Sequence, residues 1–238
     1  MPGTVLFLSK FIMKNIALLF LMLTTFAHAG VQVGGTRLIY DGNDKSAVIS
    51  LKNNEDYNYM IQTWLDNGNP TVKGQKFPVV VTPPIMKLDG GKEGFLKFIY
   101  SGKGLPEDKE SMFWINIQEI PQASEKQNSV QIAVRTRIKL FYRPVALNTT
   151  LKEQTEKLEW QRSGGEINIV NKGVFHVTLG DVIFHKGAKK WKVNANMIAP
   201  GGTAHVRIPA EAGTYERITY TYINDSGALV PVDQVDIR

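Results

Sequence analysis

The sequence predicts an all-β protein built from two sandwich domains. Short runs rich in β-branched and aromatic residues recur along the chain, and clusters of Gly, Pro, Asn and Asp separate them. The first set, of about seven runs in about 110 residues, has the number and spacing of an immunoglobulin-like sandwich. A second set follows Pro144, and a chain of 238 residues accommodates two domains of ordinary size.

The first domain is predicted to contain strands at residues 36–40, 47–53, 59–65, 78–82, 95–100, 112–120 and 129–142. The Pro83-Pro84 step favours a sheet edge or a bend between sheets, because proline cannot donate to a ladder of backbone hydrogen bonds. Trp64 has Ile61 and Leu65 close by, and we interpret it as a core tryptophan beneath a sheet.

The second domain is predicted to contain strands at residues 166–171, 174–184, 191–197, 204–208 and 217–224, and a last one near 230–237. The stretch 151–160 has some helical character but also fits a first strand. We expect the boundary near residues 143–148, which gives domains at 30–146 and 147–238.

Residues 1–29 have the pattern of a cleaved secretory signal. Lys10 and Lys14 form its basic part, and Met13 is an alternative start to Met1. An apolar run of about eleven residues follows, well short of the ~20 needed to span a bilayer, and Ala27-His28-Ala29 fits a cleavage site. We therefore expect export of the mature chain and no membrane-embedded segment.

Composition argues against an enzyme, a metalloprotein and a nucleic-acid-binding protein. There is no cysteine, and His176, His185 and His205 lack metal-ligand spacing; His176 is interpreted as a packing or surface residue. The sequence also lacks a nucleophile elbow and a phosphate-binding loop. The net charge of +6 is diffuse, without a basic cluster interleaved with aromatics. We predict no catalysis, no cofactor and no nucleic-acid partner.

Two strand-like runs indicate a binding function. Val130, Ile132 and Val134 alternate along one run, and Arg37 and Lys139 each stand as a basic residue in a strand-like run. A strand edge with apolar side chains and a positive anchor can capture another chain's strand and its terminal carboxylate. The alternative is ordinary core-facing apolar residues and solvated charges. Strict alternation also places Lys139 on the opposite face from Val130.

Further motifs identify a family resemblance. They are Thr36-Arg37-Leu38-Ile39-Tyr40, Gln62-Thr63-Trp64-Leu65-Asp66, Thr82-Pro83-Pro84, Glu110-Ser111-Met112-Phe113-Trp114-Ile115-Asn116, Glu119-Ile120-Pro121, Arg137-Ile138-Lys139-Leu140-Phe141-Tyr142-Arg143-Pro144 and Tyr222-Ile223-Asn224-Asp225. In this order behind a signal peptide, they resemble the periplasmic chaperones of the chaperone–usher pathway, which assemble pili and fimbriae in Gram-negative bacteria.

The resemblance implies two immunoglobulin-like domains at an angle with a cleft between them, located in the periplasm. The partners of the protein would be pilin subunits and an outer-membrane usher. The free protein could form a self-capping dimer, in which each copy covers the other's subunit-binding surface. A strand at about residues 129–140 would complete the pilin, with Val130, Ile132 and Val134 filling its groove. Arg37 and Lys139 would bind the subunit's C-terminal carboxylate.

The resemblance also implies an interdomain ionic cluster of Glu110, Arg143 and Asp225. The short stretch 121–129 resembles the short-loop branch of the family, and the disulfides found in some relatives are absent because there is no cysteine. The competing hypotheses are a secreted two-domain adhesin or carbohydrate-binding sandwich, which leaves Arg37 and Lys139 unexplained, and a β-sandwich hydrolase, which lacks a catalytic set.

Overall fold

A computed structural model describes residues 30–68, 76–122, 128, 130–233, 235 and 237. The predicted signal segment, residues 1–29, lies outside these residues. Val31–Arg238 forms one unit, which holds two separate hydrophobic cores. Within the described part of the chain, every helix falls short of the length and apolarity that crossing a membrane requires.

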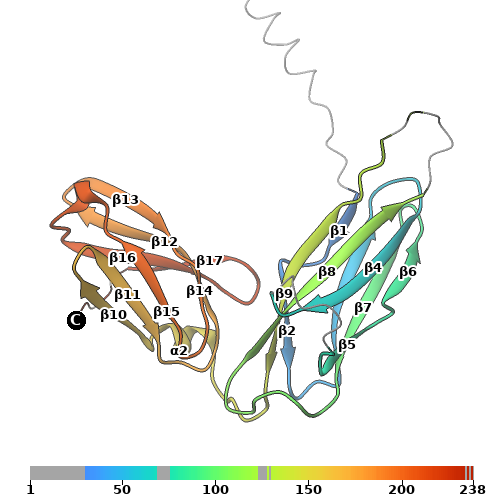
Figure 1. Cartoon of the computed structure of the whole chain (residues 1–238), viewed down its shortest axis with the longest axis horizontal. Coiled ribbons are helices and arrows are strands. Elements are labelled where there is room, and N and C mark those ends of the chain that lie inside the picture. Colours follow the sequence, from blue (N-terminus) through green and yellow to red (C-terminus); the bar gives the residue numbers. More distant parts are fainter. Residues whose placement is uncertain are drawn as a thin grey trace, which may run out of the picture. The chain divides into compact units, whose positions relative to one another are not determined.

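The first domain is a sandwich of two sheets (Figure 1). One sheet has the order β1 (Val31–Val33), β3 (Ala47–Asn53), β7 (Glu93–Tyr100) and β5 (Val79–Thr82). The other has the order β2 (Arg37–Asp41), β9 (Arg135–Arg143), β8 (Ser111–Pro121), β4 (Tyr59–Asp66) and β6 (Ile85–Leu88). All neighbouring strands are antiparallel except β2 and β9, which are parallel.

Alternation along the strands builds the first core. In β7, the even-numbered residues Gly94, Leu96 and Phe98 are buried and the odd-numbered residues from 93 to 99 are exposed. In β9, Ile138, Leu140 and Tyr142 are the residues that belong to the core, so the odd-numbered side chains face the outer side of the sheet. Whether a residue of β9 has an even or an odd number therefore decides whether its side chain faces the core or the outer side, including the side chains of the site described below.

Two short connections carry the chain from one sheet to the other. Gly34 and Gly35 separate β1 from β2, and a Cβ atom at Gly34 would lie 2.2 Å from the hydroxyl oxygen of Ser50. Only glycine permits such a close approach. Pro83-Pro84 separates β5 from β6, which belong to different sheets. The predicted bend between sheets at the two prolines is confirmed.

The second domain is also a sandwich. One sheet has the order β10 (Leu158–Ser163), β11 (Glu166–Asn171) and β15 (Thr203–Arg207). The other has the order β13 (Lys189–Asn194), β12 (Val177–Lys186), β16 (Arg217–Ile223) and β17 (Leu229–Val232), with β14 (Met197–Ile198) paired to β12. A 3-10 helix, η1 (Ala210–Ala212), follows β15. The predicted fold class of two immunoglobulin-like sandwiches is confirmed.

The stretch 151–160 combines both structures that the sequence left open. Helix α2 (Leu151–Thr155) begins at a capping box, in which Thr150 accepts from the backbone of Glu153 and the Glu153 carboxylate accepts in return. Strand β10 then starts at Leu158. Each alternative was therefore right for half of the stretch.

Three sequence predictions for the first domain need correction. The strand predicted at 129–142 begins at Arg135, and the short strands β1 and β6 were not predicted. Trp64 is not a core residue: Tyr59, Ile61 and Thr63 are buried, whereas Trp64 shares the outer face of β4 with exposed residues. The neighbouring Ile61 and Leu65 suggested a core position for Trp64. Both are an odd number of residues from it, however, and such residues lie on opposite faces of a strand.

Candidate functional site

The pairing of β2 with β9 brings Arg37 and Lys139 together. Arg37 lies opposite Lys139 in the parallel register, although 102 positions separate them in the numbering. Both precede core residues, Leu38 and Leu140, so both side chains lie on the outer side of the sheet. The two basic residues that the sequence singled out are therefore neighbours across a strand pair.

Arg37 has unused hydrogen-bonding capacity. Its Nη1 donates to the carbonyl oxygen of Ile223 at 3.3 Å, but its buried Nε has no partner among the described residues. The guanidinium carbon lies 6.0 Å from the centroid of the Phe141 ring. Burial lowers the pKa of Arg37, and the charges of Asp225 and Glu110 offset this only in part.

Lys139 lacks an acidic partner. Among the described residues, no hydrogen bond or salt bridge involves its Nζ, which lies 5.3 Å from the centroid of the Trp114 ring. Burial lowers the pKa of Lys139, and the positive charge of Arg37 lowers it further. Two half-buried cations without a carboxylate between them form a site that favours an anion.

The structure also brings Glu110, Arg143 and Asp225 together. Nε of Arg143 donates to the Glu110 carboxylate at 2.8 Å, and its two terminal nitrogens donate to Asp225, each at 2.7 Å. The Glu110 side chain is fully buried, that of Arg143 is 16% exposed and that of Asp225 is 44% exposed. Burial alone would lower the pKa of Arg143, but the bonds to Asp225 and Glu110 raise it.

His176 is a fourth member of this network that the sequence did not reveal. Its backbone N–H donates to Glu110 Oε1 at 2.8 Å, and its Nδ1 lies 2.8 Å from the same oxygen. Glu110 thus joins strand β9 of the first domain to a segment of the second. No local signal marks His176, because its partner is 66 residues away.

A tight turn brings the second domain against β2. Gly227, at φ +89°, closes the turn after Asn224, and a Cβ atom there would lie 2.3 Å from Thr36 Oγ1. Any other residue would be strained and would collide with Thr36. The glycine thereby permits Asp225 to reach Arg143 and Ile223 to reach Arg37.

Val130, Ile132 and Val134 lie outside the core. They are 90%, 75% and 49% exposed, and residues 130–134 carry no strand assignment. Their interpretation as core-facing residues is wrong. The carbonyl oxygen of Val134 accepts from the backbone of Glu119, which ties the end of the segment to β8. The three side chains share the even parity of the β9 core residues, opposite to that of Lys139.

One edge of β9 has no partner along its first half. β8 pairs with β9 from Arg135 to Tyr142, whereas β2 pairs with β9 only from Lys139 to Arg143. Among the described pairings, residues 135–138 are therefore open on the side where β2 would continue. A further strand can add at this edge, and the open stretch ends at Lys139 and Arg37.

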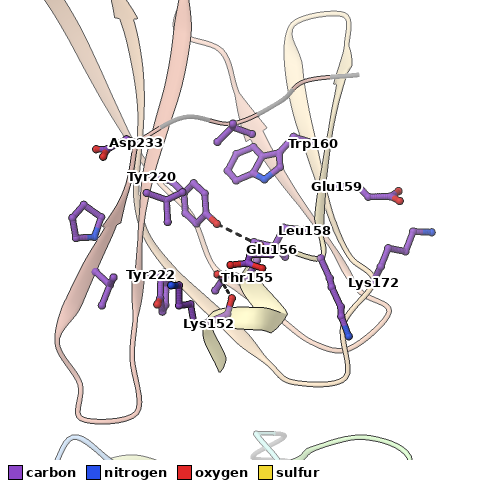
Figure 2. Close-up of a pocket in the computed structure, with 15 residues that line it drawn as sticks. Lys152, Thr155, Glu156, Leu158, Glu159, Trp160, Lys172, Tyr220, Tyr222 and Asp233 are labelled. Carbon is purple, nitrogen blue, oxygen red and sulfur yellow. Dashed lines mark hydrogen bonds between the residues drawn. The ribbon is translucent and has the colours of Figure 1, made fainter. Parts of the chain in front are cut away.

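A pocket of the second domain lies away from this site (Figure 2). It has a volume of about 820 Å³, and it lies between α2, β10, β16 and β17. Trp160 and Tyr220 are buried in its wall, and the Tyr220 hydroxyl donates to the carbonyl oxygen of Thr155 at 3.5 Å. Charges of both signs surround it, so it does not offer the concentrated positive charge of the Arg37–Lys139 site.

Comparison with known families assigns the chain. Residues 30–148 match the model described as pili and flagellar-assembly chaperone, PapD N-terminal domain, and residues 153–234 match pili assembly chaperone PapD, C-terminal domain. The chain belongs to this family. It is a periplasmic, non-enzymatic chaperone of pilus assembly, and the adhesin and hydrolase hypotheses are wrong.

Curated relatives and solved structures agree. The chain is 37% identical to the probable fimbrial chaperone LpfB of Escherichia coli O157:H7, over 92% of this chain and 93% of the relative. It is 36% identical to the chaperone protein FimC of Escherichia coli K12, over 89% and 86%. The crystal structure of the periplasmic chaperone SfaE matches with a TM-score of 0.70 at 34% identity, over 88% of this chain and 100% of that one.

Proposed function

We propose that the protein captures pilin subunits by lending them a strand, holds their C-terminal carboxylate and delivers them to an outer-membrane usher. The observation that carries this proposal is the arrangement along one strand. Three exposed apolar side chains at 130, 132 and 134 precede an open strand edge, which ends at two cations that form no ion pair with the described residues.

The geometry favours one orientation of the captured strand. A strand added to the open edge at 135–138 lies in line with β2, on the same side of β9. If it runs parallel to β9, as β2 does, its C-terminus meets Arg37 and Lys139. An extended backbone from Val134 to Lys139 is about 17 Å long, which is enough for a captured strand to pair with it over several residues.

The parity of β9 supports the donor role of the preceding segment. Ile138, Leu140 and Tyr142 fill the core of the chaperone, and the even-numbered Val130, Ile132 and Val134 continue the same row beyond the sheet. The three side chains would pack into the incomplete core of a subunit, just as the even-numbered side chains of β9 pack into the chaperone's own core. Each fully buried side chain would contribute about 1.5–3 kcal/mol.

The finer assignments belong to the same proposal. We place the protein in the short-loop branch because few residues lie between β8 and the donor segment; of that loop, residues 123–127 and 129 fall outside the described part. Cleavage after Ala29 would release domains at 30–146 and 147–238. The exposed donor segment also gives the free protein a surface for capping itself as a dimer.

Co-expression with a pilin subunit tests the proposal. The intact subunit should co-purify with the chaperone from the periplasm, and deletion of the subunit's last few residues should abolish the complex. Recovery of the truncated subunit in undiminished amount would refute carboxylate anchoring. An usher domain should bind the complex and leave the chaperone free after the subunit is transferred.

A further inference from the structure

Lys139 lies half-buried beside a second cation, Arg37, an arrangement that disfavours its charged form. Burial and the adjacent charge of Arg37 lower its pKa, and no described acid compensates. A lysine side chain has a flexible four-carbon stem, so it can rotate away from such a position. Something other than an ion pair must therefore attract its ammonium group.

Trp114 is the group that contacts it. Trp114 on β8 lies directly opposite Lys139 in the antiparallel register, and Nζ lies 5.3 Å from the ring centroid. This is within the distance at which a cation is attracted by the ring's negative face. Arg37, Lys139 and Trp114 thus form one row across three neighbouring strands.

The Trp114 ring is itself fixed by polar contacts. The Arg137 guanidinium carbon lies 4.3 Å from the ring centroid, and Arg137 forms a salt bridge with Asp66, the next residue in the same row. Nδ2 of Asn116 donates to the other Asp66 oxygen at 2.6 Å. Burial alone would raise the pKa of Asp66, but these bonds and one from the backbone of Gly68 lower it.

The loop after β4 closes against the edge of the indole. Gly68 has φ +90°, and a Cβ atom there would lie 3.2 Å from Trp114 Nε1. The Asp66 carboxylate accepts from the Gly68 backbone at 2.6 Å, which fixes this approach. The ring therefore has little freedom to leave Lys139.

We propose that Trp114 is a positioning residue for carboxylate capture. This role rests on the proposed function: the ring, braced by Arg137 and Asp66, holds the Lys139 ammonium group beside Arg37. Trp114 does not contact the carboxylate itself. It holds in place a cation whose flexible stem would otherwise let it rotate toward solvent.

The test uses Trp114→Leu and two direct readouts on the full mature chain. One is the pKa of Lys139, measured by NMR on its side chain. The other is the preference for a synthetic peptide of alternating apolar residues that ends in a free carboxylate over the same peptide ending in an amide. We expect the pKa to fall and the preference to decrease about tenfold.

The chain provides a matched control. Trp64 lies on the outer face of the adjacent strand, cross-strand from Asn116, and none of the described cations lies over its ring. Trp64→Leu should leave both readouts at the wild-type value. In a Lys139→Ala background, Trp114→Leu should reduce the preference no further, because Trp114 acts through Lys139.

The outcomes separate the inference from the proposed function. If Lys139→Ala removes the preference and Trp114→Leu leaves both readouts unchanged, the inference is overturned and the proposed function stands. If Lys139→Ala retains the full preference, Lys139 is not an anchor and the inference fails with it; if Arg37→Ala retains it as well, carboxylate anchoring itself fails. Should Trp114→Leu not fold, Trp114→Phe decides: a lowered pKa of Lys139 supports the inference, because phenylalanine attracts cations less strongly, and an unchanged pKa contradicts it.

Discussion

Lys139 and Arg37 are cations that form no ion pair within the described part of the chain. Their pKa values are lowered, so the folded state disfavours their charged forms relative to the unfolded state. For Lys139 this penalty is present at neutral pH, and it disappears as the pH rises from the folded pKa to the unfolded one. A residue that does not stabilise the fold but remains in the site is best explained by its ligand.

Lys139→Ala should abolish pilin capture without lowering the stability of the free chaperone. Removing an unpaired half-buried cation relieves a penalty, whereas a bound carboxylate loses a charged hydrogen bond of about 1.5–3 kcal/mol. Arg37→Ala should weaken capture likewise, although it also removes the bond to Ile223. Thermal melting and co-purification, measured on the same preparations, check both effects.

Arg135→Ala is the control for these variants. Arg135 is an exposed cation on the same strand and of the same parity as Lys139. Its loss should change capture little, because an exposed charge contributes about 0–1 kcal/mol. Equal losses of capture for Arg135→Ala and Lys139→Ala would mean that net charge, rather than a defined anchor, attracts the subunit.

The proposed donor segment, residues 130–134, is exposed, unlike much of the strand β9 that it precedes. Ile132→Asp should block capture, because a buried, unpaired carboxylate in the subunit groove costs several kcal/mol. The melting temperature of the free chaperone should stay nearly unchanged, since Ile132 is exposed. Subunit co-purification and thermal melting measure the two properties separately.

Gln131→Asp provides the matched comparison for Ile132→Asp. Gln131 points to the other side of an extended segment, and its side chain donates to the Gln122 carbonyl oxygen. Its replacement by Asp should reduce capture much less. A chaperone that unfolds with Ile132→Asp, or that loses capture equally with both variants, would contradict the donor-strand assignment.

Alternation and turn residues predicted most strands of both domains. The ranges 47–53 and 166–171 coincide with β3 and β11, because each is a full run of strand-forming residues closed by turn residues. The donor segment was predicted as a strand because its alternation is the same as that of a paired strand. Only the absence of a partner strand distinguishes this segment from a paired strand, and a local sequence pattern does not reveal which segments will pair.

The sequence anticipated the site less completely than the fold. Arg37 and Lys139 were singled out as basic residues in strand-like runs and received their role from the family motifs, whereas Glu110, Arg143 and Asp225 came from the family motifs alone. His176 and Trp114 were not predicted to take part, because their contacts depend on cross-strand register and on residues of another strand or domain. Their roles could be seen only when the strands were placed side by side.

On the scale of the whole molecule, one strand connects capture to the second domain. The exposed segment 130–134, the open edge at 135–138, the proposed anchor Lys139 and the network residue Arg143 follow one another along the chain. Arg37 is linked to the same junction through the Ile223 carbonyl. The ionic network therefore adjoins the Arg37–Lys139 site, and substitutions in the network should alter binding at that site.

The two acids of this network should contribute unequally to stability. Glu110 is fully buried and serves Arg143 and His176, so Glu110→Ala leaves polar groups without a partner and should cost about 3 kcal/mol. Asp225 is nearly half exposed, and Asp225→Ala should cost about 0–1 kcal/mol. Urea unfolding followed by tryptophan fluorescence compares them, since each domain contains tryptophans: Trp64 and Trp114 in the first, Trp160 and Trp191 in the second.

Glu110→Gln separates the charge from the hydrogen bonds. Glutamine keeps an oxygen that can accept from the His176 backbone, but Arg143 then has only Asp225 as a charged partner. We expect a loss of stability between those of the two alanine variants, because glutamine keeps a hydrogen-bond acceptor but removes the charge that faces Arg143. If Glu110→Ala costs no more than Asp225→Ala, the buried carboxylate does not join the domains, and the junction must depend on other contacts such as those at Gly227.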